Sequence, residues 1–395
     1  MSKAKPFFIP PTLVARQALT ALYYSALIGW GKLPHWLSKG RRTLHTAAGA
    51  VGMGCIGFPI HPVWEVTTAC NLRCIHCHAS GGKPSLGELS TVEGKKLISE
   101  IASIPEFRML VFTGGEPLMR PDIEELTRHA TSLGLEISIA TNGTLLTPSL
   151  AKRLKEARAG NIAVGLDGAS PEVHEFIRGA GSFDLAIRGL YNAKEAGFAL
   201  QLNITVMKPN LQEIPKLLDL ADKLDVDIVL LYFFVSEGRG KLHEHLEVNI
   251  TEYAQLLSYV AEQQKGMKPI VEPTCAPQYW PYLLQRSSLG RRTRRLGEVF
   301  FKGCVAGSGL CYIKSNGEVW PCPFIPFSGG NVKEKPLPWI WQNSPIFSSL
   351  RTTRNLNGRC GSCRYQHVCG GCRGRAYAHY GDYLADDPLC FIGTA

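Results

Sequence analysis

No aspartate or glutamate precedes Glu65, although the chain of 395 residues contains 33 acidic residues and has a formal charge of +10. Residues 12–30 are rich in Leu, Ala, Tyr, Ile and Trp, but Arg16 and Gln17 interrupt them and no small-residue cleavage pattern stands out. Neither a transmembrane span nor a secretory signal is therefore predicted. The basic residues that precede Glu65 are Lys3, Lys5, Arg16, Lys32, Lys39, Arg41 and Arg42.

We name residues 1–58 the leader, because they form this acid-free, apolar and basic segment. Such a composition is typical of an amphipathic helix that lies on an anionic membrane surface. A helix that packs on the rest of the fold, with its basic side chains in water, is an equal alternative. We expect a cytoplasmic protein, with a peripheral membrane contact if the leader takes the first of these roles.

The chain also lacks a cysteine pattern that suits disulfides. Its 13 cysteines are an odd number, and most of them fall into two groups with the spacing of iron-sulfur ligands. This pattern indicates a reducing cytoplasm. A length of 395 residues with 45% hydrophobic residues allows one barrel-sized domain and one smaller module.

Short apolar runs alternate with helical patterns after the leader. Strands are predicted at residues 63–69, 109–114, 135–141, 161–167, 199–206 and 227–234. Helices are predicted at residues 91–103, 121–133, 148–158, 183–196 and 212–224. Alternation of this kind implies an α/β fold with a parallel sheet, whose functional loops lie at the carboxyl ends of the strands.

Three cysteines follow the first predicted strand with the spacing C-x3-C-x2-C, and these are Cys70, Cys74 and Cys77. Three thiolates on one loop can bind three irons of a 4Fe-4S cluster and leave the fourth iron open. That iron could chelate the amino and carboxylate groups of S-adenosylmethionine. A structural zinc loop fits less well, because zinc takes four ligands and its usual knuckle is C-x2-C.

These cysteines, with Gly114-Gly115-Glu116-Pro117 after the second strand, resemble the radical S-adenosylmethionine superfamily from about residue 60 to the C-terminus. The resemblance implies a partial (β/α)6 TIM-like barrel. His76 stands where many members carry an aromatic residue beside the adenine, and Arg178 resembles the arginine that pairs with the methionyl carboxylate. The other cofactor contacts expected at strand ends are Gly114, Gly115, Glu116, Thr141, Asn142 and Asp167.

A second field of eight cysteines resembles the SPASM extension of this superfamily, which binds two auxiliary 4Fe-4S clusters. One departure is the two-residue gap, Gly370 and Gly371, where the family usually has three residues. Interleaved ligation would give one cluster Cys304, Cys311, Cys322 and Cys372, and the other Cys360, Cys363, Cys369 and Cys390. A pair of zinc sites is the alternative. Cys55 and Cys275 have no partner at ligand spacing, and an ordinary thiol is the favoured interpretation of Cys275.

The resemblance implies an enzyme that reductively cleaves S-adenosylmethionine to a 5'-deoxyadenosyl radical, with a flavodoxin- or ferredoxin-type electron donor and three 4Fe-4S clusters. Residues 304–390 look most like enzymes that trim tetrapyrrole side chains, so an oxidative modification such as decarboxylation in haem biosynthesis is expected. A peptide maturase of the SPASM type and a lipid-modifying radical enzyme are alternatives. An electron-transfer protein is the alternative without turnover. No nucleic-acid partner is expected.

The predicted organisation has four parts. The leader is followed by the barrel at residues 59–240, a connector at 241–303 and the SPASM domain at 304–395. The identity of the substrate, the role of the auxiliary clusters and the oligomeric state do not follow from the sequence.

Overall fold

The structure is a computed structural model that describes residues 48–49, 56–57, 61–107, 109–263, 267–286, 302–352 and 355–393. The predictions for the leader and for Cys55 lie outside these ranges, apart from two short strands, β1 (Ala48–Gly49) and β2 (Ile56–Gly57), which pair antiparallel. Within the described ranges, no helix is long and apolar enough to cross a membrane.

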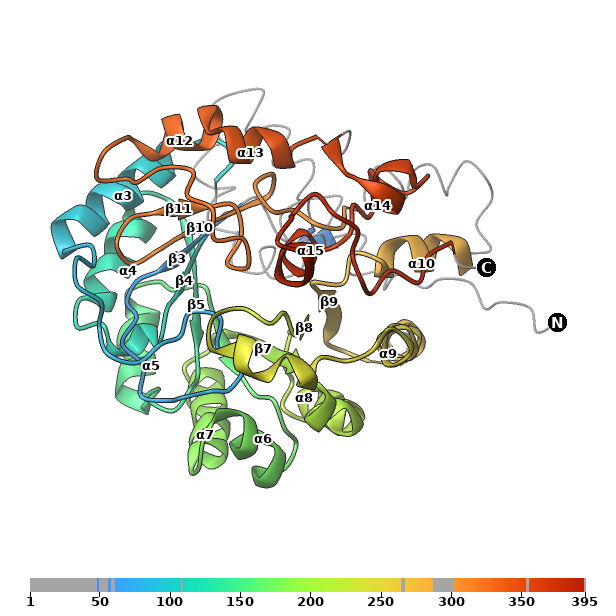
Figure 1. Ribbon diagram of the computed structural model, residues 1–395. Helices are drawn as coiled ribbons and strands as arrows, with labels where there is room; N and C mark the ends of the chain where they lie inside the picture. The colour runs from blue at the N-terminus through green and yellow to red at the C-terminus, as the bar shows by residue number, and fades with distance from the viewer. Residues whose placement is uncertain are drawn as a thin grey trace.

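A curved sheet of nine strands forms the centre of the molecule (Figure 1), in the order β11-β10-β3-β4-β5-β6-β7-β8-β9. All neighbouring strands are parallel except β10 and β11. The strands are β3 (His61–Glu65), β4 (Met109–Thr113), β5 (Glu136–Thr141), β6 (Asn161–Gly165), β7 (Ala199–Val206), β8 (Ile228–Phe233), β9 (Ile270–Thr274), β10 (Leu310–Ile313) and β11 (Val319–Trp320). The sheet is an open partial barrel, which confirms the predicted fold class.

Helices connect successive strands and cover the outer face of the sheet (Figure 1). Those of the barrel are α3 (Thr91–Ser103), α4 (Ile123–Ser132), α5 (Pro148–Glu156), α6 (Pro171–Arg178), α7 (Ser182–Glu195), α8 (Ile214–Lys223), α9 (Ile250–Gln263) and α10 (Tyr279–Arg286). The C-terminal helices are α12 (Leu337–Asn343), α13 (Pro345–Leu350), α14 (Gly358–Ser362) and α15 (Arg373–Tyr380). Three short 3-10 helices are η2 (Pro117–Met119), η3 (Lys208–Glu213) and η4 (Gly238–Leu246).

Side chains alternate between the two faces of every barrel strand, as the strand period of two requires. Trp64 and Phe112 point outward and pack edge to face, with ring centroids 5.8 Å apart. Val63 and Val111, their neighbours in sequence, line a central cavity instead. The next four strands repeat this pattern, with the cavity-lining residues Ser138, Ala140, Ala163, Gly165, Gln201, Asn203, Leu230 and Tyr232. The helices therefore cover an apolar outer face, and the inner face remains available for ligands.

Three strands extend the sheet beyond the six that the sequence predicts. β9 lies in the predicted connector and pairs with β8 along its whole length, from Ile270 to Thr274. β10 and β11 belong to the C-terminal segment, and β10 pairs with β3 at the opposite edge. The C-terminal segment also contacts the barrel through α12, where the Leu337 N–H donates to Glu100 at 2.7 Å. Sheet pairing thus places the second cysteine field beside the mouth of the barrel.

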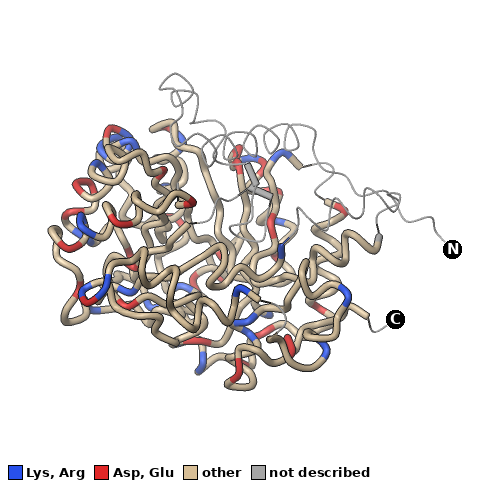
Figure 2. Tube along the Cα trace, turned by 90° about the horizontal axis from the view of Figure 1, so that it is seen from above, with Lys and Arg blue, Asp and Glu red and all other residues tan. Residues whose placement is uncertain are grey.

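Acidic and basic residues are interspersed along the outer helices (Figure 2). Neighbouring helices are joined by exposed ion pairs, such as Lys95–Glu125 between α3 and α4 and Arg153–Glu124 between α5 and α4. Exposed pairs of this kind contribute little to stability, roughly 0–1 kcal/mol each. The buried apolar face of each helix therefore accounts for more of the packing than its charges do.

Candidate active site

A cavity of about 280 Å³ lies inside the barrel and extends from the first residues of its strands, such as Met109 of β4, to the loops after their carboxyl ends. Cys70, Cys74 and Cys77 line one wall of it, so the structure brings the three cysteines of the first motif to one place. Tyr312 of β10 and Phe324, two residues after Cys322, line the cavity next to this wall, since both rings lie against His78, which follows Cys77. One chamber therefore adjoins both the first cysteine loop and the C-terminal segment.

The segment after β8 holds the cysteine loop from outside. The Arg239 guanidinium donates to the Cys74 carbonyl at 2.8 Å, and the Arg239 N–H donates to the Cys77 carbonyl at 3.0 Å. Gly238 has φ of 60°, and a Cβ there would lie 2.1 Å from the His78 carbonyl oxygen. Only glycine fits this contact. Gly238 and Arg239 thus fix the loop that carries the three thiols.

Two glycines allow the cysteine loop to approach strand β4. A Cβ on Gly114 would lie 2.3 Å from the Thr67 carbonyl oxygen, and one on Gly115 would lie 2.3 Å from the Ala69 carbonyl oxygen. The Gly115 N–H donates to the Thr67 carbonyl at 2.8 Å, which continues the pairing of the two segments. Both glycines line the cavity, and their close backbone approach positions Cys70.

Glu116 is buried, and its carboxylate accepts hydrogen bonds from three groups of the chain. The donors are the Thr141 hydroxyl at 2.7 Å, the Asn142 N–H at 2.7 Å and the Leu118 N–H at 3.0 Å. Burial raises the pKa of Glu116 although these donors oppose the shift. Glu116 does not line the cavity, whereas Thr141 and Asn142 do. The carboxylate therefore joins the ends of β4 and β5 from behind the cavity wall.

Asn142 connects the end of β5 to the cysteine loop. Its side-chain amide donates to Asn71 at 2.8 Å, and its carbonyl oxygen accepts from the Thr144 hydroxyl at 2.7 Å. The Asn71 amide in turn donates to Thr144 at 2.8 Å. This closed set of hydrogen bonds holds the loop between Cys70 and Cys74 against the carboxyl end of the strand.

Asp167, fully buried after β6, organises the other side of the cavity. Its Oδ2 accepts from Arg178 Nε at 2.6 Å and lies 2.8 Å from His76 Nε2, and its Oδ1 accepts from the Thr205 N–H at 2.6 Å. Burial alone would raise the pKa of Asp167, but the Arg178 charge and His76 hold it well below the usual range of a carboxyl group. The ionised carboxylate thus fixes both cavity-lining side chains.

Replacing Asp167 by asparagine is expected to lower the free energy of unfolding by about 3–5 kcal/mol, because Arg178 would be left as a buried charge without its partner. Urea unfolding of the metal-free protein, followed by circular dichroism, measures the change. The matched control is Asp225→Asn, since Asp225 is exposed and lies 3.9 Å from Lys194 and 3.8 Å from Lys268. Equal urea midpoints for the two variants would contradict the role given to Asp167.

The residues of this wall fit the cluster and cofactor expected from the sequence. Burial raises the pKa of the Cys70 thiol and raises that of Cys74 to about 11, and a metal that binds thiolates would lower both. A Cβ on Gly165 would lie 2.4 Å from a terminal nitrogen of Arg178, so the guanidinium occupies the cavity face of β6. A guanidinium in this place suits a ligand carboxylate.

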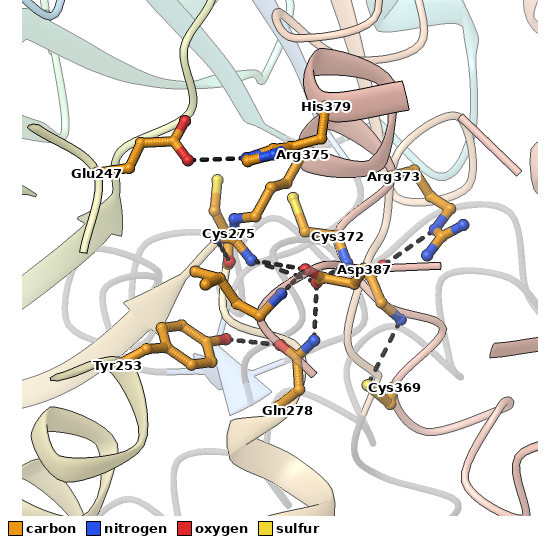
Figure 3. A network of polar contacts seen from close by, with 12 residues as sticks. Glu247, Tyr253, Cys275, Gln278, Cys369, Cys372, Arg373, Arg375, His379 and Asp387 are labelled. Atoms are coloured by element: carbon orange, nitrogen blue, oxygen red, sulfur yellow. Dashed lines mark hydrogen bonds and ion pairs between the residues drawn. The ribbon is translucent and has the colours of Figure 1, made fainter. Parts of the chain in front are cut away.

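Three cysteines of the C-terminal field come together near the cavity, and Cys275 joins them. Figure 3 shows two members of this set, Cys275 and Cys372. The Cys275 and Cys372 thiols share a hydrogen bond. Cys322 acts electrostatically on Cys275, and Cys304 and Cys372 both act on Cys322. We name these four residues, Cys275, Cys304, Cys322 and Cys372, the first auxiliary group.

Cys311, which the sequence assigned to this group, lies elsewhere. It follows Leu310 and precedes Tyr312 in β10, and both of these neighbours line the cavity. Strand alternation therefore turns Cys311 to the outer face, where it is fully buried in the hydrophobic core. Burial strongly raises the pKa of its thiol, and the charge that opposes this shift is Arg351. The structure thus separates Cys311 from the other members of its predicted ligand set.

Several cysteine sulfurs accept a backbone hydrogen bond from two residues further along the chain. Cys70 accepts from the Leu72 N–H at 3.4 Å, and Cys363 accepts from the Tyr365 N–H at 3.4 Å. The same contact is made by Cys304, Cys322 and Cys369. Such donors stabilise a thiolate ligand. In the described part of the chain, Cys311 receives no contact of this kind.

The sequence predicts a second auxiliary group of Cys360, Cys363, Cys369 and Cys390, and we keep this name for the four residues. Cys360 and Cys390 both raise the pKa of Cys369, after burial as the main cause. Gly370 and Gly371 have φ of 67° and 64°, and a Cβ on Gly371 would lie 3.0 Å from the Cys360 sulfur. Two glycines in this left-handed conformation carry the chain from Cys369 in one group to Cys372 in the other.

Sequence reasoning did not place two residues, Arg239 and Cys275, beside these cysteines. The sequence indicates only that Arg239 belongs to a loop. Nothing in Gly238-Arg239-Gly240 predicts a contact with the cysteine loop 165 residues earlier. Cys275 was favoured as an ordinary thiol because it stands far from the other cysteines. Pro273 and the positive φ of 57° at Cys275 mark a sharp turn after β9, which was the one local signal.

Comparison with protein families gives two matches. The model of the radical SAM superfamily matches residues 64–221, which include the three cysteines of the first motif, Asp167 and Arg178. The model of the SPASM family, described as an iron-sulfur cluster-binding domain, matches residues 304–372. These ranges agree with the barrel and with most of the C-terminal cysteine field.

Comparison with individual proteins gives similar results. An AdoMet-dependent heme synthase of Methanosarcina barkeri is 41% identical over 334 residues, which cover 83% of this chain and 95% of that protein. The mycofactocin maturase MftC of Mycobacterium tuberculosis is 33% identical, covering 85% of this chain and 83% of that protein. The structure of Streptococcus suis SuiB bound to S-adenosylmethionine matches with a TM-score of 0.68 and 20% identity, covering 85% of this chain and 78% of that one.

Proposed function

The chain belongs to the radical SAM superfamily and carries its SPASM extension, and from this premise we propose that it catalyses an oxidative modification of a tetrapyrrole side chain. It is a radical SAM enzyme that uses S-adenosylmethionine and iron-sulfur clusters. The observation that carries the proposal is that one cavity is lined both by the Cys70–Cys77 loop and by Tyr312 and Phe324 of the cluster-binding segment.

Cys70, Cys74 and Cys77 would hold the cluster that binds the cofactor. When bound, this cluster and S-adenosylmethionine supply a 5'-deoxyadenosyl radical, which removes a hydrogen atom from an unactivated carbon. Arg178 would bind the methionyl carboxylate, and its guanidinium is oriented by Asp167. Gly114, Gly115, Thr141 and Asn142 would form the cavity wall against the cofactor.

Glu116 and Asp167 are proposed as positioning residues, since neither lines the cavity. Glu116 holds Thr141 and the Asn142 backbone, and Asp167 holds Arg178 and His76. His76 lines the cavity and would contact the adenine. Because its Nε2 meets an ionised carboxylate, the ring is kept in one orientation for that contact.

Two auxiliary clusters would bring the number of clusters to three. We propose Cys275, Cys304, Cys322 and Cys372 as ligands of one, and Cys360, Cys363, Cys369 and Cys390 as ligands of the other. Tyr312 lies close to both the first loop and Cys322, since Cys77 and Cys322 both raise its pKa after burial as the main cause. The first auxiliary group is therefore the one nearer to the reaction chamber.

A tetrapyrrole substrate is supported by the similarity to the heme synthase of Methanosarcina barkeri, which extends over 95% of that protein. Conversion of a propionate to a vinyl group removes one hydrogen atom, releases carbon dioxide and leaves one electron to be accepted. Two clusters with four thiolate ligands each, and no open iron, are suited to that acceptance. The mostly apolar cavity, lined by Val63, Met109, Val111 and Leu230, suits the side chains of a macrocycle.

The substrate proposal is tested on anaerobically reconstituted protein with dithionite and S-adenosylmethionine. An iron porphyrin with free propionates is expected to give 5'-deoxyadenosine and a product that has lost carbon dioxide, both read by mass spectrometry. The matched control is the same porphyrin with its propionates esterified. Equal turnover of the ester, or no turnover of the free acid, would contradict the proposal.

A peptide substrate is the second candidate, and the 33% identity to the maturase MftC favours it. The result that would decide for this alternative is loss of carbon dioxide from the terminus of a precursor peptide, in an assay in which the porphyrin does not react. We also propose two further partners, which are a flavodoxin- or ferredoxin-type electron donor and, through the leader, a membrane surface.

A further inference from the structure

Arg375 and Asp387 form an ion pair inside the C-terminal segment, and both side chains are fully buried. Arg375 donates from one terminal nitrogen to both Asp387 oxygens, at 3.1 and 3.2 Å. Its other terminal nitrogen donates to the Cys275 carbonyl at 2.6 Å. The guanidinium is therefore attached both to the pair and to the backbone of a member of the first auxiliary group.

Asp387 accepts further hydrogen bonds from the same region (Figure 3). The Cys372 N–H donates to it at 2.6 Å, and the Gln278 amide donates to it at 2.7 Å. The Tyr253 hydroxyl in turn donates to Gln278 at 2.6 Å. The network thus joins α9, the turn after β9 and α15, and it reaches two cysteines of the first auxiliary group, Cys275 and Cys372.

One nitrogen atom of this network makes no hydrogen bond among the described residues. Arg375 Nε is buried and has no hydrogen-bond partner in the described part of the molecule. A buried N–H without a partner is unfavourable, and more so when the group is charged. Arg375 is drawn close to Cys275 and Cys372 in Figure 3, and its charge acts on both thiols. The free N–H is therefore found where an auxiliary cluster would supply acceptor sulfurs.

A second arginine of α15 shows what such a donor can do. Arg373 is buried as well, and its Nε and one terminal nitrogen donate to backbone carbonyls. Its remaining nitrogen donates to the Cys360 sulfur at 3.5 Å. An arginine on this helix therefore already donates to a thiol of the second auxiliary group. Arg375, two residues further along the same helix, is the equivalent donor for the first auxiliary group.

We propose that Arg375 donates its Nε–H to a sulfur of the cluster held by the first auxiliary group and raises the reduction potential of that cluster. The inference rests on the proposed ligand set with Cys275. Reduction adds negative charge to a cluster, so a hydrogen bond donated to one of its sulfurs stabilises the reduced form. Asp387 fixes the guanidinium in place, and the pair as a whole adds no net charge to the buried site.

The test is a redox titration followed by electron paramagnetic resonance, in a chain whose Cys70, Cys74 and Cys77 are alanine, so that the auxiliary clusters alone titrate. Arg375→Lys keeps the charge but removes the Nε–H. At the midpoint potential of the parent, the ratio of reduced to oxidised first cluster is expected to fall at least tenfold. For a one-electron couple this is a midpoint lower by about 59 mV.

A double variant, Arg375→Gln with Asp387→Asn, removes both charges and leaves no buried ion without its partner. It is the second test if Arg375→Lys alone does not fold. A shift in the same direction is expected. The control is His379→Gln on the same helix, because His379 is partly exposed and pairs with Glu247 at 2.8 Å. Its midpoint should equal that of the parent.

The outcomes separate this inference from the proposed function. A parent-like midpoint in either Arg375 variant that keeps its iron would overturn the role of Arg375. Failure of the unsubstituted chain to bind a cluster at the first auxiliary group, read from iron and sulfide content before any titration, would instead overturn the ligand set. A shift of equal size in His379→Gln would show a general effect of changes in α15 and would also overturn the inference.

Discussion

Replacing Cys70, Cys74 and Cys77 together by alanine is expected to abolish formation of 5'-deoxyadenosine and to leave the iron of the auxiliary clusters in place. The reason is geometric, since the three thiols line the reaction cavity and the two auxiliary groups are built from other segments. Iron content per chain and 5'-deoxyadenosine by liquid chromatography give the two readouts. A loss of at least a thousandfold in turnover is expected, on the order of 4 kcal/mol in activation free energy.

The same variant carries its own control. Its iron should fall by one cluster and not by three, because Arg373, Arg375 and Asp387 hold the C-terminal cysteines independently of the first loop. Iron content that does not change on substitution, or cofactor cleavage that persists, would refute the assignment of the first loop.

The strands and helices of the barrel were largely predictable because each is a local pattern. Residues 91–103 and 199–206 were predicted with the bounds that α3 and β7 have. α3 begins with a capping box, in which the Ser90 side chain accepts from the Glu93 N–H and Glu93 accepts from Ser90. Signals of this kind lie within one turn of the chain, so a single sequence is enough to find them.

β10 was not predictable in the same way. It has four residues, Leu310–Ile313, and it pairs in parallel with β3, whose residues lie about 250 positions earlier in the chain. Nothing local distinguishes so short an apolar run from a buried loop. The misplacement of Cys311 follows from this, because its spacing from Cys304 fits a ligand and only its position in a strand shows that the thiol faces the core.

Residues at the ends of the strands could be named from the sequence as candidate cofactor contacts, but their individual roles could not. Glu116 and Asp167 stand at strand ends, as the sequence indicates, yet their carboxylates are satisfied by groups of the protein behind the cavity wall. Whether a carboxylate at a strand end faces the ligand or its neighbours depends on which donors surround it. Those donors, Thr141, Arg178 and Thr205 among them, come from other strands and loops.

Cys275 and Cys311 give opposite expected results when each is replaced by alanine. Cys275→Ala should release or degrade the cluster of the first auxiliary group, because its thiol shares a hydrogen bond with Cys372 and lies among the other proposed ligands. Cys311→Ala should keep the iron of all clusters, because its thiol packs in the hydrophobic core on the outer face of β10. Iron and sulfide content, with electron paramagnetic resonance of the reduced protein, measures both.

The two variants control each other, since both remove one buried sulfur. Cys311→Ala should cost stability through the small cavity that it leaves, on the order of 1 kcal/mol, and shift the thermal midpoint without changing the cluster signals. Cys275→Ala should change the signal of one auxiliary cluster and lower product yield, while formation of 5'-deoxyadenosine continues because the first loop is intact. Loss of a cluster signal in Cys311→Ala, with all signals kept in Cys275→Ala, would restore the ligand set that the spacing alone suggests.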